Sequence, residues 1–73
     1  MNIEREKRKA HTKLEALHII EEMVKYEIPL EDAQEFFRRG YVGAAMRLNR
    51  GNQCKAAKAI GIHRNTVRRI MED

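Results

Sequence analysis

The strongest constraint on the fold lies in residues 51–70, GNQCKAAKAIGIHRNTVRRI, where small and branched apolar residues recur on both sides of Gly61. Apolar residues at three- and four-residue steps predict helices, and a glycine between two such segments can take the positive φ of a tight turn. Ala57 lies four residues before this glycine, at the point where two helices would press together. The stretch therefore predicts two short helices, one over residues 53–60 and one from residue 63 or 64 to about residue 71.

This arrangement matches the helix-turn-helix pattern. The residues expected to bury the unit against a core are Ala56, Ala57, Ile60, Ile62, Val67 and Ile70. The side chains left outside are polar or basic: His63, Arg64, Asn65, Arg68 and Arg69 on the second helix, and Lys55 and Lys58 on the first. In such units the second helix enters the DNA major groove by its N-terminal end, and the first lies across the backbone. Because Arg can bind guanine and Asn adenine bidentately, this surface predicts binding to double-stranded DNA.

The upstream residues predict two longer helices. Apolar residues such as Leu14, Leu17 and Ile20 give residues 3–27 a helical stripe, and Pro29 is expected to stop that helix. A second helix is expected over residues 31–50, with Gly51 as its left-handed cap. Asn52 would then cap the third helix.

Two glycines interrupt the second predicted helix. Gly40 and Gly43 each cost about 1 kcal/mol relative to alanine inside a helix. They are either simply tolerated or needed for close contact with another helix, and the sequence leaves both readings open.

The length of the chain limits how it can be stabilised. A chain of 73 residues forms one small domain, and such a domain buries only about 60% of the surface that its unfolded chain exposes. Cys54 is the only cysteine, so no intrachain disulfide forms, and no Cys/His cluster has the spacing of a zinc site. Oligomerisation is the remaining route. We therefore expect an all-α chain of four helices, with a dimerisation region at residues 1–50 and a helix-turn-helix unit at residues 51–73.

Charge is distributed unevenly along the chain. Residues 1–32 carry six basic and eight acidic side chains, net −2, whereas residues 33–73 carry nine basic and three acidic, net +6. This asymmetry indicates an anionic partner for the C-terminal half. No apolar run reaches the roughly 18 residues of a membrane span, no signal peptide is recognisable, and a lone thiol fits a cytoplasmic location. Without a nucleophile–base pair, phosphate loop or carboxylate dyad, the sequence predicts no enzyme, cofactor, metal or small-molecule ligand.

The same stretch resembles the Fis-type helix-turn-helix family, which includes the nucleoid protein Fis and the DNA-binding domains of NtrC-type activators. The shared elements are GNQ, the paired alanines, and a GI.RNT segment followed by an apolar and then basic residues. The resemblance implies an intertwined homodimer core built from the first two helices of each chain. It also implies a DNA-bound protein of the bacterial nucleoid, with the transcription machinery as a further partner.

The resemblance assigns roles to individual residues. Arg64 matches the arginine that reads a base edge, and Thr66 and Arg69 match positions at or near the bases. The positions on or beside the phosphate backbone are matched by Asn52, Gln53, Cys54, Lys55 and Arg68. Two residues depart from the pattern: His63 replaces the usual Ser or Asn helix cap, and Ile70 replaces a common basic residue.

Three functions are compatible with these features. The first is a sequence-specific DNA-binding homodimer, either a transcriptional regulator or a DNA-bending nucleoid protein. The second is the DNA-binding domain of an NtrC-type, sigma-54-dependent activator. The third, from a different class, is a helical protein–protein interaction module that does not bind DNA.

Overall fold

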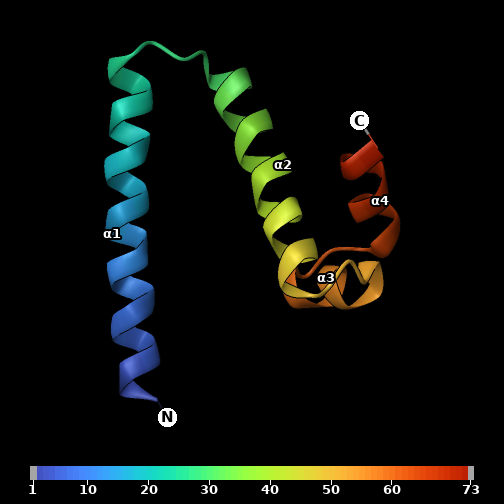
Figure 1. The fold of residues 1–73 in the computed structure, drawn as a ribbon. Helices are drawn as coiled ribbons and strands as arrows, with labels where there is room; N and C mark the ends of the chain where they lie inside the picture. Colours follow the sequence, from blue (N-terminus) through green and yellow to red (C-terminus); the bar gives the residue numbers. More distant parts are fainter. Residues whose placement is uncertain (1, 73) are drawn as a thin grey trace. The chain divides into compact units, whose positions relative to one another are not determined.

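The computed structural model describes residues 2–72 of the chain, and they are helical apart from turns and short connections. Figure 1 shows four helices in order: α1 (Ile3–Lys25), α2 (Leu30–Leu48), α3 (Gln53–Ile60) and α4 (Arg64–Glu72). The described residues contain no strand, so the predicted all-α chain of four helices is confirmed. The chain divides between Leu30 and Glu31 into two compact units, the first containing α1 and the second nearly all of α2 with α3 and α4. The functional boundary at residue 50 stays a prediction.

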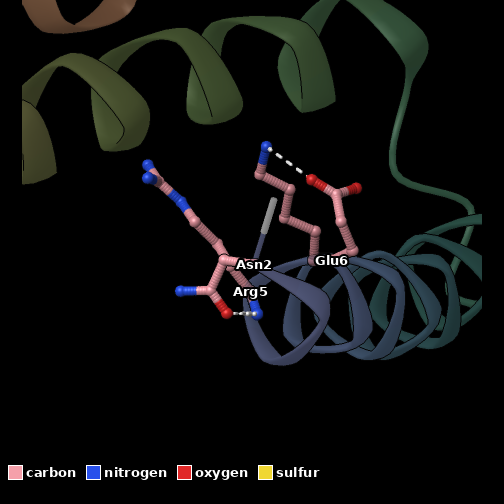
Figure 2. Close-up of polar contacts among 4 residues, drawn as sticks. Asn2, Arg5 and Glu6 are labelled. Carbon is pink, nitrogen blue, oxygen red and sulfur yellow. Dashed lines mark hydrogen bonds and ion pairs between the residues drawn. The ribbon is translucent and has the colours of Figure 1, made fainter.

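Both ends of α1 are fixed by local hydrogen bonds. Asn2 caps the N-terminus, since its Oδ1 accepts a hydrogen bond from the Arg5 N–H at 3.1 Å (Figure 2). At the other end the Glu27 N–H donates to the Val24 carbonyl at 2.9 Å and the Ile28 N–H donates to the Met23 carbonyl at 3.0 Å. This pair of bonds is a Schellman motif, with Glu27 in the left-handed region at φ 58°. The helix therefore ends two residues before the predicted limit of residue 27, at a turn that precedes Pro29.

The surface of α1 is mixed in character and largely exposed. No residue of Ile3–Lys25 is buried within the chain. The first turns carry exposed charges, including an ion pair between Lys9 Nζ and Glu6 Oε1 at 3.7 Å (Figure 2). Further along, the predicted apolar stripe is 48–71% exposed at Leu14, Leu17, Ile20 and Val24. No helix among the described residues is long and apolar enough to cross a membrane.

The end of α2 differs by two residues from the prediction. The helix stops at Leu48, and both Arg50 and Gly51 adopt positive φ, 54° and 78° respectively. Here the Gly51 N–H donates to the Met46 carbonyl at 2.8 Å, and the Arg50 N–H donates to the Arg47 carbonyl at 3.2 Å. The left-handed conformation predicted for Gly51 is confirmed, but the helix-ending position of this motif is occupied by Arg50.

The second unit has one small core. Val42 of α2, Ala57 of α3 and Val67 of α4 are buried together, and Met46, Ile60, Ile62 and Ile70 pack around them. Gly61 ends α3 at φ 74°, which lets the Ile62 N–H donate to the Ala57 carbonyl at 3.0 Å. The burial predicted for Ala56, Ala57 and Val67 is confirmed, whereas the three isoleucines are only half-buried because they lie at the edge of this core.

Candidate nucleic-acid interface

The first part of the site is the N-terminus of α3. Asn52 is its N-cap, as predicted: the side-chain Oδ1 accepts a hydrogen bond from the Lys55 N–H at 3.0 Å. Gln53, Cys54 and Lys55 follow in the first turn, and all are exposed. No acidic side chain lies in that turn. The helix dipole and Lys55 therefore present positive charge at this end of α3, the condition under which a helix terminus attracts a phosphate.

The second part is the N-terminus of α4. His63 immediately precedes the helix, and its Nδ1 accepts a hydrogen bond from the Asn65 N–H at 3.0 Å. The carbonyl of His63 also accepts from the Thr66 and Val67 N–H groups, at 2.9 and 3.3 Å. The imidazole thus supplies the side-chain cap that the sequence pattern assigns to Ser or Asn.

The exposed side of α4 is set by what the helix buries. Val67 is 0% exposed and anchors the helix on the core, with Ile70 half-buried one turn later. The polar and basic residues on either side of Val67 are exposed: Arg64, Asn65, Arg68 and Arg69. Thr66 is half-buried, beside the anchoring valine. The prediction that burying the apolar residues leaves these four side chains outside is therefore confirmed.

Two side-chain contacts join predicted site residues to one another. Arg64 Nη1 lies 3.8 Å from Cys54 Sγ, so the guanidinium at the start of α4 reaches the first turn of α3. On α4 itself, Arg69 Nη2 lies 3.5 Å from Thr66 Oγ1. Both contacts are long and exposed, so each guanidinium can leave its partner for a stronger acceptor such as a phosphate or a guanine edge.

Glu72 belongs to the same surface, although it is not among the predicted site residues. Its Oε1 lies 3.9 Å from Arg68 Nε, and both side chains are mostly exposed. A shallow depression on α4 is lined by Asn65, Arg68, Arg69 and Glu72. The four-residue spacing between Arg68 and Glu72 is the signal that could have revealed this pair. An exposed pair of this kind contributes little stability, so its main effect is to reduce the positive charge near the end of α4.

All eleven predicted site residues lie on α3, on α4 or directly before them. They are Asn52, Gln53, Cys54, Lys55, Lys58, His63, Arg64, Asn65, Thr66, Arg68 and Arg69. Figure 1 shows these two helices next to each other at the C-terminal end of the chain. Within residues 2–72, no group of three or more His, Cys, Asp or Glu side chains could hold a metal ion.

Comparison with known protein families agrees with this geometry. The family model for bacterial regulatory proteins of the Fis family matches residues 35–72, just over half of the chain. The chain belongs to the Fis family. Comparisons with curated proteins and with solved structures give no match.

The match to the Fis family also separates the chain into two parts. Residues 35–72 include most of α2 and all of α3 and α4, and therefore every predicted site residue. Helix α1 lies outside the matched residues. Membership in the Fis family indicates a DNA-binding regulator, and it does so through the part of the chain that carries the basic surface.

Proposed function

We propose that this Fis-family protein is a sequence-specific double-stranded DNA-binding regulator that acts as a homodimer on the bacterial chromosome. The observation that carries the proposal is the exposed surface of α4, where Arg64, Asn65, Arg68 and Arg69 remain outside while Val67 fixes the helix on its core. In helix-turn-helix proteins the corresponding helix enters the major groove by its N-terminal end.

The proposed contacts fall into two classes. Arg64 and Asn65, with His63 and Thr66 beside them, read base edges, because their donors and acceptors lie at the end of α4 that would enter the groove. Arg69 lies in the last turn of α4, but its guanidinium extends back to Thr66 and is the third proposed base-reading group. Asn52, Gln53, Cys54, Lys55, Lys58 and Arg68 bind phosphates and set the orientation of the protein on the duplex. Arg47 and Arg50, at the end of α2, add further positive charge.

A homodimer is supported by the apolar surface that the chain leaves open. Leu14, Leu17 and Val24 of α1 are each more than half exposed, and so are Phe36 and Phe37 of α2. Large exposed apolar patches on small domains mark interaction sites, and the proposed occupant here is a second copy of the chain. A two-fold dimer would place two α4 helices on two half-sites with approximate palindromic symmetry. If the two helices lie closer than one DNA turn, about 34 Å, the duplex must bend to admit both.

The direct test is the salt dependence of binding to duplex DNA. Counterion release predicts that the logarithm of the association constant falls linearly with the logarithm of salt concentration, with a slope that counts the neutralised phosphates. Sites selected from random DNA should then bind at least about a thousand-fold more tightly than unselected sequence. Failure to bind any duplex at low salt would reject the proposal in favour of a helical protein–protein interaction module.

A further inference from the structure

The hydrogen bond at the start of α4 fixes the protonation pattern of His63. A backbone N–H can only donate, so the Nδ1 atom that faces the Asn65 N–H at 3.0 Å must be the acceptor. An imidazole nitrogen that accepts a hydrogen bond carries no proton, and the single proton of the neutral ring is then on Nε2. The cap bond and a proton on Nδ1 exclude each other.

We propose that His63 has two coupled roles: its Nδ1 caps α4, and its Nε2–H is a fixed hydrogen-bond donor to an acceptor atom on DNA. The second role rests on the proposed function, whereas the first concerns the free protein. His63 is exposed and directly precedes Arg64, at the end of α4 that would enter the groove. The cap bond therefore leaves Nε2 as the nitrogen available to DNA and makes it a hydrogen-bond donor.

A donor-only nitrogen restricts what His63 can recognise. On DNA the available acceptors are phosphate oxygens, purine N7, guanine O6 and thymine O4, whereas the amino groups of adenine and cytosine are donors. Ser or Asn at this position could donate or accept, because each carries both kinds of group. A histidine held by its cap bond can only donate through Nε2, so it cannot pair with the amino groups of adenine and cytosine. His63 is thus a positioning residue for α4 that also acts in specificity.

The protonation pattern can be measured in the protein without DNA. Long-range proton–nitrogen NMR correlations on the free protein at about pH 8, above the ordinary range of histidine pKa values, distinguish the two neutral forms. We expect the His63 spectrum to show a protonated Nε2 and an unprotonated Nδ1, with His18 of α1 as the internal reference. A spectrum with the proton on Nδ1 would overturn the inference. If the wild-type protein bound no DNA, this measurement would still stand and only the proposed function would fail.

Two substitutions separate the cap from the donor. His63→Ser keeps a side chain that caps helices well but removes the imidazole, whereas His63→Ala removes both. We expect His63→Ser to retain the thermal stability of the wild type and to bind a selected duplex about ten-fold more weakly. We expect His63→Ala to be less stable and to bind at least as weakly as His63→Ser. Binding by His63→Ser as tight as that of the wild type would overturn the donor role.

Modified duplexes identify the acceptor. Replacing N7 of a contacted purine by carbon removes a base acceptor, and a methylphosphonate removes the charged oxygen of one phosphate. At the contacted position one of these changes should weaken the wild type about ten-fold and leave His63→Ser unaffected, because the shorter serine side chain does not extend to the atom that Nε2–H contacts. If the wild type and His63→Ser lose equal affinity with every purine N7, guanine O6, thymine O4 and phosphate analogue across the half-site, the inference is wrong.

Discussion

Arg50 holds a left-handed backbone conformation, φ 54°, that is unfavourable for a residue with a Cβ atom. The cost of this conformation is about 1–2 kcal/mol for an ordinary L-residue, and glycine avoids it. We expect Arg50→Gly to raise the free energy of unfolding by about 1 kcal/mol, measured by urea denaturation in the absence of DNA. Arg50→Ala is the matched control, because it removes the charge and keeps the Cβ atom. Equal stability of the two variants would show that backbone strain is not relieved at this position.

Arg64 and Lys55 should differ in how their loss affects binding. Arg64 lies at the N-terminus of α4, where we propose that it reads a base, and Lys55 lies in the first turn of α3, where we propose that it binds a phosphate. Arg64→Ala should cost about 1–3 kcal/mol on the selected site and relax specificity at one base pair. Lys55→Ala should weaken all sequences alike and reduce the salt slope by about 1. Equal losses on every sequence for both variants would contradict this division.

Individual residues differ in how far sequence predicts their conformation. Asn52 and Gly61 could be placed correctly because each acts through local chemistry, an amide that caps and a backbone free to take positive φ. Arg50 was not predicted, because the glycine that follows it is the stronger local indication of a helix end. The Nδ1 bond of His63 depends on the rotamer of one ring, which residue type alone does not specify.

The contact between α3 and α4 depends on a small residue at one position. Ala57 is 3% exposed within the core, whereas Ala59 on the same helix is exposed. Ala57→Leu should reduce the free energy of unfolding by about 1–3 kcal/mol, because the added carbons have no space between the helices. Ala59→Leu introduces the same side chain into solvent and should change stability by less than about 0.5 kcal/mol. Thermal unfolding of both variants measures the difference, and similar losses would mean that Ala57 is not the contact point.

Gly40 offers a test of the second helix. A Cβ atom added to Gly40 would meet nothing within 4 Å inside the chain, so the fold of one chain gives no reason for a glycine there. Its neighbours Phe36, Phe37 and Tyr41 are exposed, and the last two rings stack with centroids 5.3 Å apart. We expect Gly40→Ala to weaken the proposed dimer, in which a second helix would approach the backbone at this position.

The readout for Gly40→Ala is the dimer dissociation constant from sedimentation equilibrium, with helicity by circular dichroism as the control. Alanine favours a helix over glycine by about 1 kcal/mol, so helical content should not fall. A variant that dimerises as tightly as the wild type and is more stable would indicate that the glycine is merely tolerated.

Helix boundaries show why elements were predicted better than their ends. The apolar spacing was sufficient to place four helices, and α3 has the predicted bounds. Helices α1 and α2 both end earlier than expected. Glu27 and Arg50 take left-handed conformations there, although neither residue is a glycine. These ends are set by paired backbone hydrogen bonds, which depend on backbone geometry rather than on residue type.

At the scale of the whole chain, the sequence indicates which residues are apolar but not which are buried in one copy. The aromatic residues of α2 and the stripe of α1 have the spacing of core positions, yet they are exposed. Among residues 2–72 the buried apolar side chains are Val42, Ala45, Ala56, Ala57 and Val67, all in the second unit. Periodicity alone cannot separate a core that one chain completes from a core that two chains complete.

Leu17 is the residue through which the proposed dimer is best tested. It lies within the apolar stripe of α1, 52% exposed in the single chain, and a two-fold dimer would bury it twice. Each buried leucine contributes about 1.5–3 kcal/mol, so Leu17→Glu should weaken the dimer by at least about 3 kcal/mol, more than a hundred-fold in dissociation constant.

His18→Glu places the same carboxylate on the neighbouring exposed position and should leave the dimer intact. In light scattering the wild type and His18→Glu should show twice the chain mass of 8.6 kDa, whereas Leu17→Glu should approach that mass itself and lose its preference for a two-half-site duplex over a single half-site. The wild type could instead be monomeric at all concentrations and still prefer the two-half-site duplex over a single half-site. That result would show that α1 does not form the proposed dimer interface.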